Sequence, residues 1–147
     1  MSRDIQNLLL DSLCDSMRNV IPRPIDQAEA TAGERPDAVD EMGVAISFAD
    51  PISVRMIIDG ERRMFSKMSE VMFGMPMEGE MLDSCVGEIA NIIAGGTTTL
   101  LSNRGISADI TPPSLLAGKT AVDGYENGLA LNIEEVGNMR IMLLGGN

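Results

Sequence analysis

Residues 78–96, which read EGEMLDSCVGEIANIIAGG, decide the fold because they predict one long amphipathic helix. At about 100° per residue, the apolar side chains of this stretch gather into one stripe that would face a core. We expect the helix to start near Glu78 and to run through Ile93. The pair Gly95 and Gly96 is expected to break or bend it, and residues 97–103 would resume it. The stripe consists of Leu82, Cys85, Val86, Ile89, Ile92 and Ile93.

The opposite face of this predicted helix carries polar side chains. Within an arc of roughly 60° fall Ser84, Glu88, Asn91 and Gly95. This arc lies roughly 130° from the apolar stripe, so Glu88 and Asn91 should face solvent. Gly87 and Gly95 leave little side-chain bulk beside them. A carboxylate can pair with a cation of a partner, and a carboxamide can hold a water. The pair therefore predicts half of a hydrolytic site, although such residues are also ordinary on the wet side of a helix.

The rest of the chain predicts helices and strands in an α+β order. We expect one domain over residues 1–147, with a mainly antiparallel sheet packed by long helices on one face. Residues 22–43 are interpreted as a loop or a loosely held edge strand. A hairpin turn is expected at Gly137 and Asn138. The further predicted helices are 4–21 and 61–73, and the predicted strands are 44–48, 53–58, 106–111, 114–117, 129–133 and 140–144.

Composition and charge narrow the classes of function. The 147 residues carry a net charge of −11, which disfavours binding to nucleic acid. The chain has no histidine, which excludes Ser-His and Cys-His catalysis and imidazole metal ligands. Its two cysteines, Cys14 and Cys85, form no motif and are read as small core residues of a reduced, cytoplasmic protein. No membrane span and no signal peptide are expected.

A short internal repeat links the first helix to the motif helix. The tripeptide Leu-Asp-Ser occurs at residues 10–12 and again at 82–84, an offset of 72. Three identical residues can arise by chance, but the sharper interpretation is a duplicated unit with one degenerate copy. In this register the pairs are Ser12 with Ser84, Ser16 with Glu88, and Asn19 with Asn91. Serine in place of the carboxylate argues against a working second site.

Residues 87–96, together with 105–107 and the two prolines 112 and 113, resemble the CheC/CheX/FliY family of chemotaxis phosphatases. That family's signature is Asp or Ser, three residues, Glu, two residues, Asn, and Pro about 22 residues later. Those places are taken here by Asp83 and Ser84, Glu88, Asn91 and Pro113. The resemblance covers residues 4–144 and implies a pseudo-duplicated CheC/CheX-like fold. One intact motif is more similar to CheX than to CheC, whose members carry two.

The resemblance implies a phosphatase that hydrolyses the aspartyl phosphate on a CheY-type response-regulator receiver, in chemotaxis or related two-component signalling. Glu88 would pair with the active-site lysine of the receiver, and Asn91 would orient the attacking water. Supporting or partner-binding positions would be Asp83, Ser84, Gly87, Gly95 and Pro113. The receiver would hold the phosphoryl group and Mg²⁺, so we expect no metal or cofactor on this chain. The resemblance also implies a homodimer.

Two alternatives stay open from the sequence. The same fold could act as a non-catalytic module that binds a receiver or serves as a flagellar or signalling adaptor. A homodimeric structural protein of unrelated fold is the third interpretation. Faster loss of phosphate from a receiver at substoichiometric amounts of the chain would favour the enzyme over the binding module, and a solved topology would separate the structural protein.

Overall fold

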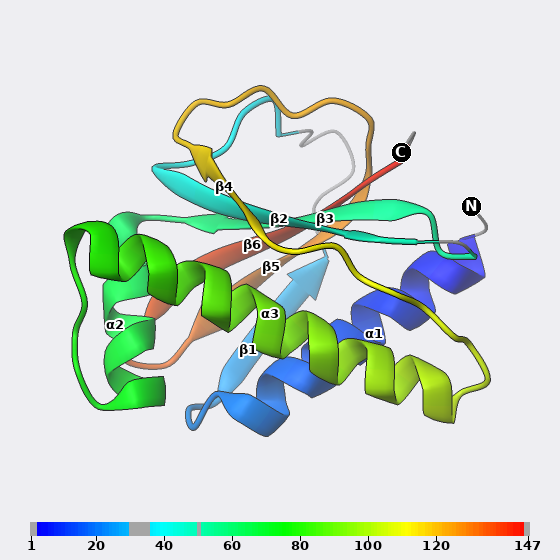
Figure 1. Ribbon diagram of the computed structural model, residues 1–147, viewed down its shortest axis with the longest axis horizontal. Coiled ribbons are helices and arrows are strands. Elements are labelled where there is room, and N and C mark those ends of the chain that lie inside the picture. Colours follow the sequence, from blue (N-terminus) through cyan, green and yellow to red (C-terminus); the bar gives the residue numbers. More distant parts are fainter. Residues whose placement is uncertain (1–2, 30–35, 50, 146–147) are drawn as a thin grey trace.

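The computed structural model describes residues 3–29, 36–49 and 51–145, and within them three helices cover one face of a six-stranded antiparallel sheet (Figure 1). The helices are α1 (Arg3–Val20), α2 (Arg62–Phe73) and α3 (Gly79–Asn103). The strands are β1 (Ile25–Glu29), β2 (Met42–Phe48), β3 (Val54–Gly60), β4 (Ser114–Ala117), β5 (Tyr125–Ile133) and β6 (Gly137–Leu144). The strand order is β1-β5-β6-β3-β2-β4. This arrangement confirms the expected α+β class.

The main core lies between the helices and the sheet. Five of the six residues in the predicted apolar stripe of α3 are buried there, with Val86 and Ile93 at 0% exposure, whereas Ile92 is only half-buried. Burying a side chain of this size contributes about 1.5–3 kcal/mol, so this stripe holds α3 firmly on the sheet. Many methionines fill the same core, which agrees with their use as adaptable packing groups. They include Met17, Met42, Met56, Met64, Met68 and Met139.

A smaller core lies on the other face of the sheet. There the segment before β2 and the segment between β4 and β5 cover β2, β3 and β6. Backbone hydrogen bonds join the two segments, among them Val39 N to Thr120 O at 2.8 Å and Val122 N to Asp37 O at 2.9 Å. Beneath them are buried Val39, Ala45, Ile57, Val122, Met142 and Leu144. The region 22–43, expected as a loop or edge strand, places β1 at one edge of the sheet. Residues 30–35 of that region lie outside the described residues.

The predicted break at Gly95 and Gly96 is wrong, because α3 continues through both residues to Asn103. Helix α1 packs against α3 at this point. An added Cβ on Gly96 would lie only 2.4 Å from Ser16 Oγ, and that hydroxyl donates to the carbonyl oxygen of Ile93 at 2.7 Å. Gly96 is therefore a close-contact residue between two helices rather than a helix terminator.

Two predictions about strands also need correction. Residues 106–111 form no strand; only an isolated bridge joins Ile110 to Phe48 on β2. The next two residues are prolines without backbone N–H groups, so pairing with β2 resumes only at β4. The last hairpin turns at residues 134–136, because Gly137 already pairs with Ile133 at the base of the hairpin. Glu135 takes the left-handed conformation that the turn needs, with φ of 65°.

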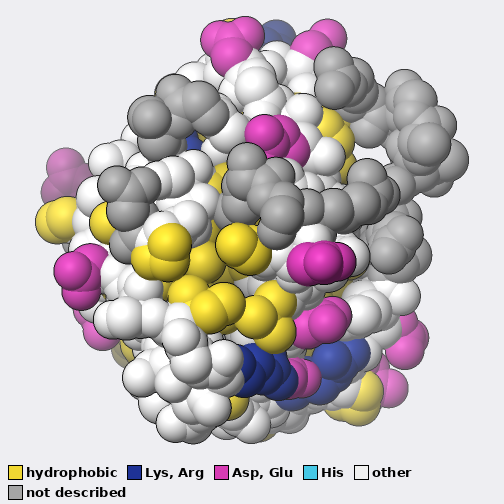
Figure 2. Space-filling view, turned by 90° about the vertical axis from the view of Figure 1, so that its right-hand side faces the viewer, with side chains coloured by type: hydrophobic (Ala, Val, Ile, Leu, Met, Phe, Trp, Pro, Cys, Tyr) yellow, Lys and Arg dark blue, Asp and Glu magenta, His cyan; other side chains and the backbone are white. Residues whose placement is uncertain are grey.

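The surface is strongly acidic, as the net charge of −11 requires. Figure 2 shows the end of the molecule remote from α2, where a group of hydrophobic side chains has acidic side chains to its right and basic side chains directly below it. Across the described parts of the chain, no helix has both the length and the apolar composition needed to cross a membrane.

Candidate functional site

Helix α3 presents the acid and the amide of the motif on its exposed face. Glu88 and Asn91 are both exposed, while Ile89 and Ala90 between them are buried at 1% and 0% exposure. The helical periodicity of the sequence predicts this orientation, and the structure has it. Because the buried stripe fixes the helix from behind, the two polar side chains project from a rigid support.

Beside this face lies a shallow hollow of about 630 Å³, here called the motif hollow. One wall is α3 itself, and the other is the segment that follows α3 and runs back along it to β4 (Figure 1). An added Cβ on Gly87 would lie 3.6 Å from Pro113 Cγ, an ordinary van der Waals distance, so Pro113 lies directly against the helix at this residue. The lining residues are Ser84, Gly87, Glu88, Asn91, Ile110, Thr111, Pro112 and Pro113.

Two of the predicted supporting residues do not line this hollow. Asp83 instead makes an ion pair with Arg62, whose Nη2 lies 3.2 Å from Asp83 Oδ1, and so links α3 to α2. Gly95 lies one turn beyond Asn91, and none of the described side chains comes within 4 Å of a Cβ placed there. The structure thus brings Ser84, Gly87 and Pro113 to the pair Glu88 and Asn91, and leaves Asp83 and Gly95 outside.

The degenerate copy on α1 has become part of a helix interface. Ser12 and Ser16 are buried, at 0% and 1% exposure. Arg104, at the end of α3, donates a hydrogen bond to Ser12 Oγ and pairs with Asp15 at 3.1 Å. Asn19 alone remains exposed. These positions therefore present no exposed acid and amide like those of α3.

The thiol nearest the motif offers no reactive nucleophile. Cys85 is buried at 6% exposure, and burial, followed by the nearby charge of Glu88, raises its pKa above the usual value. A thiol with a raised pKa stays protonated at neutral pH and reacts slowly. The Ser84 hydroxyl has no histidine to activate it as a nucleophile, because the chain contains no histidine. The arrangement suits positioning of an outside reactant rather than covalent catalysis.

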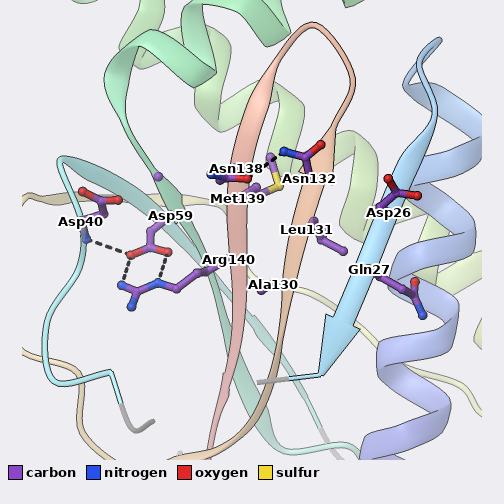
Figure 3. Close-up of a pocket in the computed structure, with 11 residues that line it drawn as sticks. Asp26, Gln27, Asp40, Asp59, Ala130, Leu131, Asn132, Asn138, Met139 and Arg140 are labelled. Atoms are coloured by element: carbon purple, nitrogen blue, oxygen red, sulfur yellow. Dashed lines mark hydrogen bonds and ion pairs between the residues drawn. The ribbon is translucent and has the colours of Figure 1, made fainter. Parts of the chain in front are cut away.

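Sequence reasoning missed an ion pair between buried Asp59 and half-buried Arg140, on the face of the sheet opposite the helices, shown in Figure 3. Asp59 has 0% exposure, and its carboxylate accepts hydrogen bonds from Arg140 Nε at 2.9 Å and Nη2 at 2.5 Å. Asp59 also accepts from the backbone N–H of Asp40 at 2.8 Å, and Arg140 donates to Ala38 O at 3.0 Å. The hydrogen bond to Asp59 is the main cause that raises the pKa of Arg140. The pair thus anchors residues 38–40 to the sheet.

The hollow next to this ion pair has a volume of about 340 Å³ and is lined by residues of β1, β3, β5 and β6. Asp26, Asp40 and Asp59 all border it, but the described part of the chain holds no group of three or more acidic, Cys or His side chains placed to hold a metal ion. Only the cross-strand register, in which Asp59 lies opposite Arg140, reveals the pair. No local sequence pattern signals it.

Comparisons with known proteins point to one family. The family model described as "Chemotaxis phosphatase CheX" matches residues 42–134. No curated protein sequence matches the chain.

Solved structures share the fold at low identity. A CheC-like superfamily protein from Shewanella sp. PV-4 has 22% identity and a TM-score of 0.69, with 98% of each chain covered. The chemotaxis protein CheX from Vibrio vulnificus has 20% identity and a TM-score of 0.70, with 95% of each chain covered. CheX of Borrelia burgdorferi, solved in complex with CheY, BeF₃ and Mg²⁺, has 19% identity and a TM-score of 0.70, with 97% of this chain and 98% of that chain covered.

Proposed function

The chain belongs to the CheX family of chemotaxis phosphatases, and on that premise we propose that it accelerates hydrolysis of the aspartyl phosphate on a CheY-type receiver. One observation carries the proposal: Glu88 and Asn91 project together from the exposed face of a rigid helix into an open hollow. The complex of Borrelia burgdorferi CheX with CheY supports a receiver as the partner.

In this proposal each partner supplies half of the site. The Glu88 carboxylate pairs with a lysine of the receiver and docks α3 over the phosphorylated aspartate. The Asn91 amide accepts and donates hydrogen bonds, so it orients a water for in-line attack on phosphorus. The receiver holds the phosphoryl group and its Mg²⁺. Phosphoryl transfer depends mainly on positioning and on charge stabilisation, which is why two exposed side chains can suffice.

The proposal is tested by following phosphate release from a phosphorylated CheY-type receiver at substoichiometric amounts of the chain. Asn91→Ala should lower the stimulated rate by roughly 10²–10³-fold, the usual effect of losing one positioned group, while binding changes little. Glu88→Ala should weaken binding as well as the rate, because the docking charge is lost. Matched controls are Asn103→Ala at the end of α3 and Glu70→Ala on α2, both exposed and outside the motif hollow. Unchanged rates in both motif variants would reject these roles.

The catalytic step, the oligomeric state and the location of the protein can each be tested separately. If the wild-type chain binds a receiver but never accelerates its dephosphorylation, the non-catalytic module is the correct interpretation. We also propose that the protein works as a homodimer in the cytoplasm. Sedimentation of the purified chain tests the dimer directly.

A further inference from the structure

A second hollow, of about 740 Å³, adjoins the motif hollow and shares Ser84 and Glu88 with it. We call it the apolar shelf, because most of its lining comes from Phe73, Met77, Met81 and Cys85. Phe73 is 43% exposed and Met81 is 61% exposed. Among the described residues, four large hydrophobic side chains are exposed, and three of them are Phe73, Met81 and the nearby Met75 in the loop between α2 and α3. Such a concentration of exposed apolar surface marks an interaction site.

The turn between α2 and α3, which borders the shelf, is held in place by part-buried hydrogen bonds. Ser69, at 0% exposure on α2, accepts a hydrogen bond from Met77 N at 3.0 Å, and its hydroxyl lies 3.2 Å from Met75 O. Gly74 ends α2 in the left-handed conformation, with φ of 85°, and its N–H donates to Glu70 O at 2.8 Å. The shelf therefore has an ordered support: Phe73 ends α2, Met81 and Cys85 lie on α3, and Met77 lies in the fixed turn between the two helices. A surface that is already ordered loses less conformational entropy when a partner binds.

Charge selects the kind of partner. Glu80 and Glu88 border the shelf, and the whole chain carries a net charge of −11. A second copy of the chain would bring the same acidic groups against them, which opposes self-association at this place. A partner that offers an apolar side chain next to lysine or arginine would satisfy both parts of the surface. Methionine side chains can adapt their shape to such a partner.

We propose that the apolar shelf docks the receiver, taking an apolar side chain flanked by basic residues from the surface beside its phosphorylation site. This inference rests on the proposed function, because continuity through Ser84 and Glu88 places the shelf next to the groups that would act on phosphate. The shelf would determine which receivers bind, while Asn91 serves the chemical step.

The test uses Phe73→Ser and Met81→Ser, with Leu115→Ser on β4 as the matched control. Leu115 is 46% exposed and lines neither hollow. Binding is measured by calorimetric titration with a CheY-type receiver loaded with BeF₃ and Mg²⁺, and phosphate release is measured against receiver concentration. Each shelf variant should raise Kd and KM roughly tenfold or more, as expected on losing an apolar anchor, with kcat within about twofold. Leu115→Ser should leave all three unchanged. Circular dichroism confirms that each variant is folded.

The outcomes separate this inference from the proposed function. If the wild-type chain accelerates phosphate release and the shelf variants keep its Kd and KM, the shelf is not the docking surface while the function stands. If the chain binds the receiver without accelerating hydrolysis and the shelf variants weaken binding, the inference holds and the phosphatase proposal fails. If the shelf variants instead dissociate a dimer and bind the receiver normally, a second copy occupies the shelf and the inference is overturned. A chain that binds none of its host's receivers overturns both.

Discussion

Replacing Gly96 with alanine is expected to destabilise the protein, whereas the same substitution at the neighbouring Gly95 should stabilise it. Both glycines lie inside α3, where alanine is intrinsically preferred by roughly 0.5–1 kcal/mol. At Gly95 no described atom beyond the helix's own backbone lies within 4 Å of the added Cβ, so this gain should appear in full. At Gly96 the new methyl group would lie 2.4 Å from Ser16 Oγ and 3.4 Å from Ser16 Cβ.

The expected loss of stability in Gly96→Ala arises because the added methyl group would displace the Ser16 side chain. Its hydroxyl is buried and bonded to Ile93 O at 2.7 Å, so it cannot simply rotate into solvent. Overpacking of this kind costs typically 1–3 kcal/mol, and a displaced hydrogen bond adds about 0.5–1.5 kcal/mol. After the gain in helix propensity, the net loss should be roughly 1–3 kcal/mol. The difference between the two single variants should therefore exceed about 1.5 kcal/mol.

Urea unfolding followed by circular dichroism measures both variants, and Tm should move by about 2–4 °C per kcal/mol in a chain of this size. Adding Ser16→Ala to Gly96→Ala removes the clashing oxygen and should restore most of the lost stability. The carbonyl oxygen of Ile93 keeps a second donor, Thr97 Oγ1, at 2.7 Å. Equal stabilisation by both glycine substitutions would refute the close α1–α3 contact, as would a double variant no more stable than Gly96→Ala.

Three further predictions concern the remaining buried and charged groups. Arg140→Met should lower stability by about 3–5 kcal/mol because it leaves Asp59 charged and fully buried. Asp59→Asn should cost less stability, because the Arg140 side chain reaches solvent. Urea unfolding midpoints compare the two variants, and a larger loss in Asp59→Asn than in Arg140→Met would contradict this explanation. Burial raises the pKa of Cys14 from 9.0 to about 11. Above about pH 9 the unfolded chain therefore loses the thiol proton before the folded protein does. The free energy of unfolding of the wild type should fall relative to that of Cys14→Ala by up to about 1.4 kcal/mol per pH unit until pH 11. Parallel curves of unfolding free energy against pH for the two proteins would exclude this effect of Cys14. Arg62→Ala removes only an exposed pair with Asp83 and should change the free energy of unfolding by less than about 1 kcal/mol in thermal melts.

Much of the fold was predictable because its elements have strong local patterns. The apolar stripe of residues 82–93 indicates both the existence of α3 and its buried side. Gly74 correctly marks the end of α2. The errors fall where a residue's role depends on a distant segment. Gly96 looks like a helix breaker until α1 is seen against it, and residues 106–111 look like a strand although the prolines that follow cannot continue the pairing.

The amino-acid sequence by itself determined that Glu88 and Asn91 share an exposed helix face, since helical periodicity relates residues only three or four apart. Tertiary structure alone decided that Pro113 forms part of one wall of the motif hollow, that Ser16 is buried against Ile93, and that the shelf adjoins Glu88. It also decided the pairing of Asp59 with Arg140, 81 residues apart. Contacts over such separations depend on the path of the whole chain, and no local pattern of residues encodes that path.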